Sequence, residues 1–370
     1  MFRQYKFQNY NLRLVIFVIA LGIIGYFAVG SAQESLRQRQ MFGIILGIVL
    51  MFFLSFTDYS IYRYLYWIFY FFNIILLALV LSPLGVEVNG SKRWINIGFQ
   101  FQPSELAKIL LILFFAQFIM KYKEKINSPR ILITMILLLA APLYLVFKEP
   151  DLSTSIMIVV AFCVMIFVGG LSYKIVLTLL AVIIPTVVAF FVVILKPDAE
   201  KTILQGYQVT RILAWLEPEK YADSAAYQQL NSITAIGSGQ LFGKGLDNNV
   251  IASVKNGNFI SEPQTDFIFA IVGEELGFIG SAGVVILVLL IVWECLLIGR
   301  NAKDLAGCLI ACGVAGLIGL QAFLNIAVAT GLAPNTGIPL PFVSYGLTSL
   351  VSLFGAIGIV INVGLQTKKH

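Results

Sequence analysis

Apolar runs alternate with short polar segments along almost the whole chain. About 20 residues of α-helix are needed to cross the hydrocarbon core of a bilayer, and ten runs come close to that length. They cover residues 12–30, 41–57, 61–82, 104–120, 131–147, 152–170, 175–195, 276–298, 305–330 and 342–365. The pattern therefore predicts an all-α polytopic membrane protein with about ten transmembrane helices.

The connection between the seventh and eighth runs, at about residues 196–275, is far longer than the others. Apolar side chains recur at helical spacing from Val209 to Leu216, and a second amphipathic stretch runs from Ala226 to Ile233. The glycine-rich sequence "AIGSGQLFGKGL" ends this stretch. We expect two helices lying on the outer membrane surface, followed by a tight backbone turn.

The end of this connection, "DFIFAIVGEE" at residues 266–275, is an apolar strip with an acid at its start. Residues 276–298 can span the bilayer without it, and Pro263 limits how far a helix extends backwards. We expect a helical piece that lies at the outer interface or dips into it. Glu274 and Glu275 point about 100° apart on a helix, so they cannot act as a catalytic pair. At least one of them is expected to be a structural partner for a base or for helix ends.

The composition agrees with the hydrophobic pattern. Of the 370 residues, 59% are hydrophobic and 12% are charged, and the mean hydropathy is +0.90. These values exclude an ordinary soluble enzyme. No internal repeat is visible, which weakens a transporter interpretation because many transporters are built from repeats. The simplest organisation is a single integral membrane domain over residues 1–370, with the extracytoplasmic loop at about residues 196–275.

Lysine and arginine predict the orientation. If the N-terminus is cytoplasmic, the inner segments carry far more of these residues than the short outer loops do, as the positive-inside rule requires. Both termini are then expected in the cytoplasm and the long loop outside. The net charge of +6 mainly reflects this bias, so it gives no case for nucleic-acid binding.

Acid–base chemistry in this chain must depend on residues other than histidine. The only histidine is the last residue, His370, which excludes histidine triads and histidine zinc sites. Carboxylates or lysines are left as the acids and bases.

The segment "GSKRWINIGFQFQPSELAKIL" carries two of them at the start of the fourth run. Pro103 suits the first turn of a helix, which places Glu105 near the positive end of the helix dipole. Lys108 follows three residues later on the same face. An acid and a base that enter a membrane in this way are candidates for function. The alternative is a structural ion pair that fixes the helix.

Four further polar residues fall on the same predicted outer side. Asp151 lies in the turn "FKEPDLSTS", where it is either functional or a helix cap. Arg211 could hold a phosphate through its planar fork of donors, or simply face solvent. Lys244 in "GKG" could meet an anion. Asp266 is the best catalytic candidate because it opens the apolar strip, and a helix-capping role is its alternative.

Five segments in this order resemble the signature segments of the SEDS family (shape, elongation, division and sporulation proteins, with RodA, FtsW and SpoVE as familiar members). They are "RWINIGFQFQPSELAK", "EPDLSTS", "AIGSGQLFGKGL", "QTDFIFAIVGEELGFIG" and "GIPLPFVSYG". The resemblance runs from about residue 12 to 365. One departure is Leu347, which stands where the family often has a second glycine.

The resemblance implies a peptidoglycan glycosyltransferase that polymerises lipid II on the outer face of the bacterial plasma membrane, beside a class B penicillin-binding protein. It implies that Asp266 is the essential aspartate of the family. Glu105 and Lys108 match its Pro-Ser-Glu segment, and Asp151 matches its Pro-Asp-Leu segment.

The expected reaction is the attack of a sugar 4-hydroxyl on the anomeric carbon of a second lipid-linked sugar, with inversion. Asp266 is assigned as the general base. Lys108, Arg211 and a divalent cation (Mg²⁺ or Mn²⁺) are candidates for stabilising the departing pyrophosphate. Glu105 would either orient Lys108 or bind that cation.

Two other functions remain open at this point. A flippase for lipid-linked precursors would also need intramembrane charges, but it would transport without making polymer. A non-catalytic scaffold for a penicillin-binding protein would tolerate the loss of all these charges. The clustering of acids and bases argues against the scaffold, and the carboxylate at the outer interface favours the enzyme over the flippase.

Overall fold

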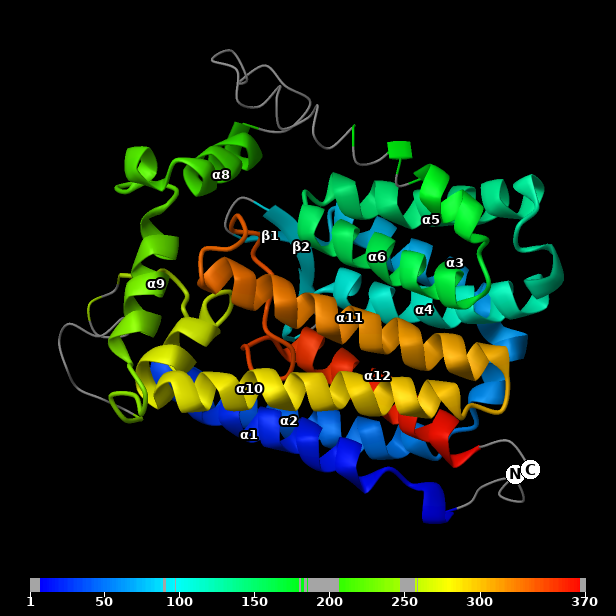
Figure 1. Cartoon of the computed structure of the whole chain (residues 1–370), viewed down its shortest axis with the longest axis horizontal. Coiled ribbons are helices and arrows are strands. Elements are labelled where there is room, and N and C mark those ends of the chain that lie inside the picture. The colour runs from blue at the N-terminus through cyan, green and yellow to red at the C-terminus, as the bar shows by residue number, and fades with distance from the viewer. Residues whose placement is uncertain are drawn as a thin grey trace.

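Long helices lie side by side along the longest axis of the molecule (Figure 1). The structure is a computed structural model that describes residues 7–88, 91–96, 98–179, 181–182, 185, 206–246, 257 and 259–366. The long helices are α1 (Leu12–Ala32), α2 (Glu34–Ser55), α3 (Tyr62–Leu81), α4 (Pro103–Lys121), α5 (Pro129–Lys148), α6 (Leu152–Val168), α10 (Ile268–Arg300), α11 (Leu305–Ala329) and α12 (Leu347–Leu365). Two shorter helices, α8 (Gly206–Leu216) and α9 (Tyr227–Ser238), belong to the long loop.

Nine of the ten predicted runs are helices in the described part of the chain, which confirms a polytopic membrane protein. Eight of these helices are long and apolar enough to cross a membrane, and the 17-residue α6 is slightly shorter. The seventh predicted run, 175–195, lies mostly outside the described residues, although residues 173–179 are helical. The amphipathic stretches predicted in the long loop are α8 and α9.

Helix α4 lies at the centre of the bundle. In its apolar part 89% of the residues are buried, against 22% in α3 and α5, so those two helices lie at the outside of the bundle. Helices α3, α6, α11 and α12 surround α4. On the other side, α12 packs closely on α2, since a Cβ atom added at Gly358 would lie 2.4 Å from the Met51 carbonyl oxygen.

A small antiparallel sheet, which the sequence did not predict, precedes α4 in this otherwise helical fold. Its strands are β1 (Gly85–Val88), β2 (Ser91–Asn96) and β3 (Gln100–Phe101), in the order β1-β2-β3. Ile95 pairs with both Gly85 and Phe101. Strand β3 leads directly into α4, which begins at Pro103 as predicted.

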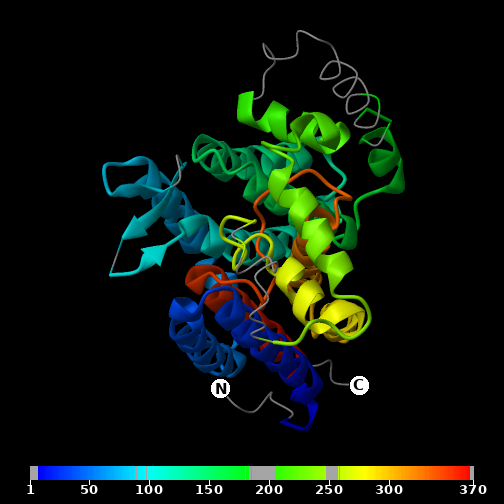
Figure 2. The ribbon, with the colours of Figure 1, turned by 90° about the vertical axis from the view of Figure 1, so that its left-hand side faces the viewer.

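The sheet, α8, α9 and the first residues of α4, α6 and α10 gather at one end of the bundle (Figure 1). Helix α1 begins and α12 ends at the opposite end. Figure 2 looks onto the first end, where the loop between α11 and α12 passes among the surrounding elements. The loops that carry the candidate residues therefore meet at one end of the molecule.

Candidate active site

Glu105 and Lys108 form a buried ion pair in the first two turns of α4. The Lys108 Nζ to Glu105 Oε1 distance is 2.8 Å, and the two side chains are only 3% and 5% exposed. The predicted pairing is therefore confirmed. Neither charge is stable in such surroundings without the other, because removing a charge from water costs several kcal/mol.

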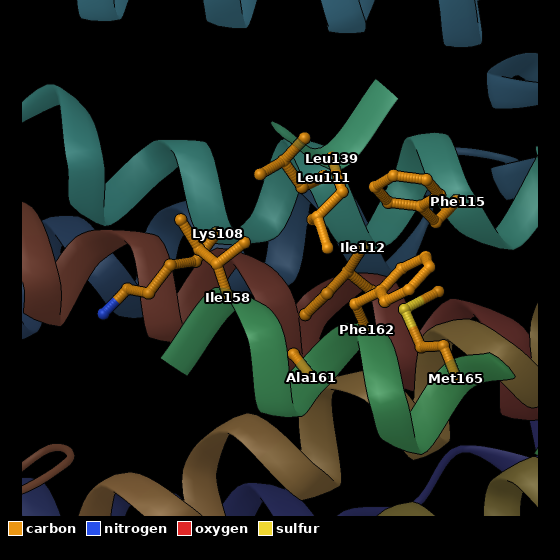
Figure 3. Close-up of a pocket in the computed structure, with 9 residues that line it drawn as sticks. All are labelled: Lys108, Leu111, Ile112, Phe115, Leu139, Ile158, Ala161, Phe162 and Met165. Atoms are coloured by element: carbon orange, nitrogen blue, oxygen red, sulfur yellow. The ribbon is translucent and has the colours of Figure 1, made fainter. Parts of the chain in front are cut away.

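Apolar side chains surround the aliphatic part of Lys108. The Lys108 chain lies over a cavity of about 10 Å³ between α4, α5 and α6, with its nitrogen pointing away from the cavity (Figure 3). The remaining walls are apolar, and Phe115, Leu139 and Phe162 are among them. A space of this size holds one water at most, so the charges interact in a medium of low polarity.

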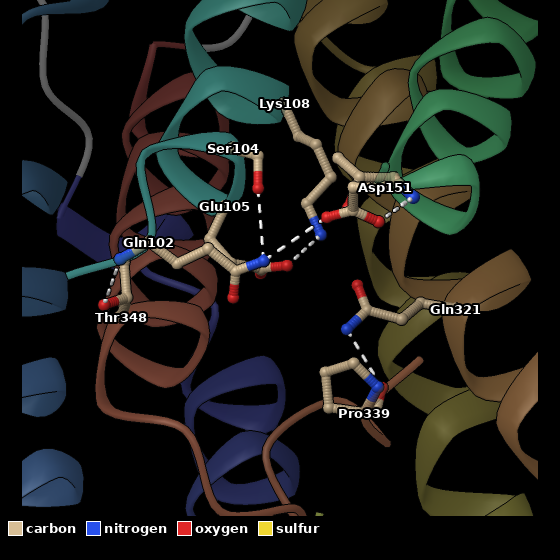
Figure 4. A network of polar contacts seen from close by, with 9 residues as sticks. Gln102, Ser104, Glu105, Lys108, Asp151, Gln321, Pro339 and Thr348 are labelled. Atoms are coloured by element: carbon tan, nitrogen blue, oxygen red, sulfur yellow. Dashed lines mark hydrogen bonds and ion pairs between the residues drawn. The ribbon is translucent and has the colours of Figure 1, made fainter. Parts of the chain in front are cut away.

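Asp151 joins α6 to the same cluster. Its carboxylate accepts hydrogen bonds from Thr154 N at 3.1 Å and Thr154 Oγ1 at 2.9 Å, so it caps α6. Gln102, which precedes α4, donates from Nε2 to Asp151 Oδ2 at 3.4 Å. The side chains of Gln102, Glu105, Lys108 and Asp151 point toward one another (Figure 4). The capping alternative for Asp151 is confirmed, and the cap lies within the polar cluster.

Arg93 of β2 holds the turn before Asp151, a role that the sequence did not reveal. Its Nε donates to the Glu149 carbonyl oxygen at 3.2 Å, and its Nη2 donates to the Pro150 carbonyl oxygen. In the sequence Arg93 was visible only as one charge in a short outer loop. The sheet brings it to the turn, and no local spacing signals that contact.

Glu149 is a buried acid that the sequence analysis also missed. Both of its carboxyl oxygens are buried and have no hydrogen-bond partner among the described residues. Burial, with a smaller contribution from the negative charge of Asp151, raises the pKa of Glu149 to about 9 against the opposing effect of Arg93. Glu149 is therefore neutral at physiological pH.

Asp266 lies in the turn before α10, partly buried. Phe267, and not Asp266, directly precedes the helix, and no side-chain bond caps it. The capping alternative for Asp266 therefore finds no support. The Asp266 carbonyl oxygen accepts from Asn325 Nδ2 at 2.7 Å. A Cβ atom added at Gly337 would lie 3.3 Å from Asp266 Oδ2, so the carboxylate faces the α11–α12 loop.

The charges around Asp266 connect it to the other candidates. Burial raises the pKa of Asp266 to about 6. Arg211 and Arg93 lower it, whereas Glu262 and Asp151 raise it. Arg211 in α8 also donates from Nη1 to the Asn335 carbonyl oxygen at 3.3 Å, and its side chain is exposed. Asp266 thus shares one electrostatic environment with Asp151 and two arginines.

The α11–α12 loop, residues 330–346, is hydrogen-bonded to α6, to α11 and to the turn before α10. Ser153 of α6 donates to its Thr336 carbonyl oxygen, and Gln321 of α11 donates to its Pro339 carbonyl oxygen at 3.0 Å. Ser344 Oγ donates to the Thr265 carbonyl oxygen at 2.7 Å. At its end Leu347 opens α12 and lies against Gly43 of α2, where an added Cβ would come within 3.0 Å of Leu347 Cδ1.

The apolar strip after Asp266 is the first part of α10. It is a separate helical piece, as expected, because Gly277 has φ 64° and ψ −161° and interrupts the helix. Ile268 to Glu275 are all buried within the protein. The strip packs among α1, α9 and α11, and its place at the outer interface stays a prediction.

Lys244 and the two glutamates stabilise this interruption. Lys244 Nζ lies 2.8 Å from Glu274 Oε1, and Ser31 Oγ donates to Glu275 Oε1. The backbone N–H of Lys244 also donates to the Glu274 carbonyl oxygen at 2.9 Å. The ion pair confirms that at least one of the two glutamates, Glu274, is a structural partner for a base.

The comparisons with known proteins agree with this arrangement. The family model described as "Cell cycle protein", which covers FtsW, RodA and SpoVE, matches residues 6–369. The chain belongs to the FtsW/RodA/SpoVE family. Stage V sporulation protein E of Bacillus subtilis is 34% identical over 97% of this chain and 98% of its own length. A probable peptidoglycan glycosyltransferase FtsW of Trichlorobacter lovleyi is 32% identical over 99% of this chain and 96% of its own length.

Solved structures of the FtsW/RodA/SpoVE family share the fold. A chain from a peptidoglycan synthase complex, solved in work on the coordination of polymerization and crosslinking, has a TM-score of 0.77. It is 30% identical, and the match covers 96% of this chain and 97% of that one. The crystal structure of the Thermus thermophilus rod shape determining protein RodA has a TM-score of 0.69 at 27% identity, with 98% of both chains covered.

Proposed function

We infer that the chain is a peptidoglycan glycosyltransferase that polymerises lipid II. The relative from Trichlorobacter lovleyi is named a probable peptidoglycan glycosyltransferase. Two observations in this structure support it: Arg211 and Asp151 act electrostatically on Asp266, and Gln102, Glu105, Lys108 and Asp151 form one polar cluster at the same end of the helix bundle (Figure 4). A lipid-linked sugar diphosphate needs a base, cations and an apolar surface in one place.

Asp266 is proposed as the general base. A base works best when its pKa is close to the pH at which it operates, and burial brings the pKa of Asp266 to about 6. The carboxylate would take the proton from the acceptor 4-hydroxyl as that oxygen attacks the anomeric carbon of the donor. The bond from that carbon to the pyrophosphate oxygen breaks, and the configuration inverts.

Lys108 and Arg211 are proposed to stabilise the departing pyrophosphate. Arg211 is exposed near Asp266 and offers a planar fork of donors to phosphate oxygens. Lys108 is paired with Glu105, so it would have to share its charge between the carboxylate and the substrate. Glu105 orients Lys108 in this account.

A divalent cation would have to share its ligands with the substrate. The described residues contain no group of three His, Cys, Asp or Glu side chains that could hold a metal ion. Mg²⁺ is often bound by one or two carboxylates together with substrate phosphates. Asp151 is the carboxylate beside the proposed phosphate site that fits this kind of binding.

We propose that both termini are cytoplasmic and that the site faces outward. The excess of Lys and Arg at the end where α1 begins and α12 ends supports this orientation. A class B penicillin-binding protein is the proposed partner, because a structure similar to this chain comes from a complex that both polymerizes and crosslinks.

The proposed function is tested with the purified chain in detergent or liposomes, with and without a co-purified penicillin-binding protein. Glycan strands formed from lipid II are expected in at least the second case. Movement of lipid II across the liposome membrane without polymer would support the flippase instead. Unchanged partner activity after all the cluster charges are replaced would support the scaffold.

A further inference from the structure

Five basic side chains lie at the end of the bundle opposite the candidate active site. They belong to the end of α4, the start of α5, the connection between these helices and the segment that follows α6, away from the sheet (Figure 1). All five are exposed, and they form a basic patch: Lys121, Lys123, Lys125, Arg130 and Lys174.

Asn127 joins the two chain segments that carry the basic patch. Its Nδ2 donates to the Gly170 carbonyl oxygen at 3.2 Å, and its Oδ1 accepts from Ser172 N at 2.7 Å. The ends of α4 and α6 also pack closely, since a Cβ atom added at Gly169 would lie 2.6 Å from Ile119 Cγ2. The fold therefore holds the two basic segments side by side.

The positive charges of the basic patch are not neutralised by nearby acids. Among the residues that the structure describes, none of the five forms an ion pair. The α4–α5 connection contains one acid, Glu124, and residues 169–174 contain none. Arg130 lies in the first turn of α5 without an acid beside it, where the helix dipole adds positive charge. The patch thus sets five cations against one acid.

Exposed apolar side chains lie next to the cations of the basic patch. Ile133 follows Arg130 by three residues on α5 and is 57% exposed. Leu177 follows Lys174 by three residues and is 66% exposed, within the helical residues 173–179. Residues three apart on a helix share a face, so each cation has an apolar neighbour one turn further into the bundle. Tyr173 is exposed beside Lys174, and tyrosine is common at the headgroup level of a membrane.

We propose that the basic patch binds the headgroup of an anionic glycerophospholipid, whose acyl chains lie along α5 and the helical segment after α6. A phosphodiester accepts strong hydrogen bonds from lysine and arginine, and basic clusters beside transmembrane helices attract anionic lipids. An acidic protein segment would match the charge but not the apolar side chains one turn below it. In the proposed orientation this lipid belongs to the cytoplasmic leaflet. The proposal concerns binding and stands apart from the polymerisation of lipid II.

The test compares two pairs of cations at the same end of the bundle. Lys125→Gln with Lys174→Gln removes one cation from each segment of the patch. Arg13→Gln with Arg300→Gln removes two exposed cations from α1 and α10 and serves as the control. A third variant, Asn127→Ala, keeps every charge and breaks the link between the two segments. Native mass spectrometry of the purified chain in detergent gives the apparent Kd for phosphatidylglycerol and for phosphatidylcholine.

The wild type should bind phosphatidylglycerol more tightly than phosphatidylcholine. The patch variant should weaken phosphatidylglycerol binding by about tenfold or more, because each cation near the lipid contributes to its attraction. The control pair should change it by less than about threefold, and Asn127→Ala should weaken it although the net charge is unchanged. Equal losses in the patch and control pairs would overturn the proposal, since diffuse surface charge would explain both. Unchanged binding in the patch variant would also overturn it and favour an acidic protein segment.

A crosslinking measurement on the wild-type protein needs no variant. Phosphatidylglycerol with a photoreactive headgroup should label residues 121–130 and 171–179 in preference to the surroundings of Arg13 and Arg300. The labelling should fall at about 0.5 M salt, because salt screens attraction between exposed charges. Labelling spread evenly over all basic segments at this end, or labelling that phosphatidylcholine in excess abolishes, would overturn the assignment.

Discussion

Four acids at one end of the molecule have different interactions because their immediate surroundings differ. Glu105 has a lysine partner, and Asp151 caps a helix. Glu149 is buried without a hydrogen-bond partner among the described residues, and Asp266 is partly buried beside two arginines. The sequence identified three of these four residues through motifs. Glu149 was missed because its character depends on burial, which the turn between α5 and α6 creates.

The pH dependence of the reaction tests the state of Asp266. As the general base it must be deprotonated, and burial raises its pKa to about 6. We therefore expect kcat/KM to rise with pH through about 6 and to be about tenfold below its plateau at pH 5. The measurement is the initial rate of lipid II polymerisation between pH 4.5 and 8. A rate that does not change between pH 5 and 7 would contradict the assignment.

Glu149 should make the protein less stable as the pH rises. The folded state keeps its proton up to a pKa of about 9, whereas the unfolded state loses it near the ordinary value of 4.5. The free energy of unfolding should therefore fall as the pH rises between these values. Glu149→Gln is neutral in both states, so its Tm should exceed that of the wild type by more at pH 8.5 than at pH 5.5. Parallel Tm curves for the two proteins would show that Glu149 is not a buried neutral acid.

At the scale of the elements, local signals predicted helix boundaries only where they were strong. Helix α4 begins at Pro103 as predicted, because proline favours the first turn. Helix α2 begins at Glu34, earlier than predicted. Its first turns, "ESLRQRQ", are polar, so a prediction based on apolar runs placed the start of the helix too late. The sheet was missed because its strands are only two to six residues long.

The protein should be especially sensitive to substitutions in the buried ion pair of α4. Lys108→Met leaves Glu105 buried and unpaired, so we expect a loss of about 3–5 kcal/mol in the free energy of unfolding. Lys125→Met, at an exposed lysine, should change it by less than about 0.5 kcal/mol. Both are measured as thermal or denaturant stability in detergent.

Exchanging the two residues of the pair separates its structural role from its catalytic role. The variant with Glu105→Lys and Lys108→Glu should recover stability better than activity, because the cation would be displaced from the phosphate site. Wild-type polymerisation by this variant would show that neither residue has a positional role.

For the whole molecule, apolar runs and basic residues were sufficient to predict a membrane bundle and its proposed orientation. They could not predict which loops meet. Arg93, Gln102 and Asn325 reach the site from a strand, a helix start and the core of α11. The α11–α12 loop connects these parts through backbone carbonyl oxygens, which no side-chain pattern encodes. The burial of the strip after Asp266 likewise depends on α1, α9 and α11 closing around it.

The most direct test of the account is lipid II polymerisation by Asp266→Asn. This substitution keeps the size and most of the hydrogen bonding of Asp266 but removes the basic oxygen. The variant should keep its thermal stability and partner binding, while polymerisation falls by at least about 10²-fold. Glu274→Gln and Glu275→Gln, which alter the contacts to Lys244 and Ser31, should lower stability more than turnover. Polymer formed at a near-normal rate by well-folded Asp266→Asn protein would contradict Asp266 as the general base.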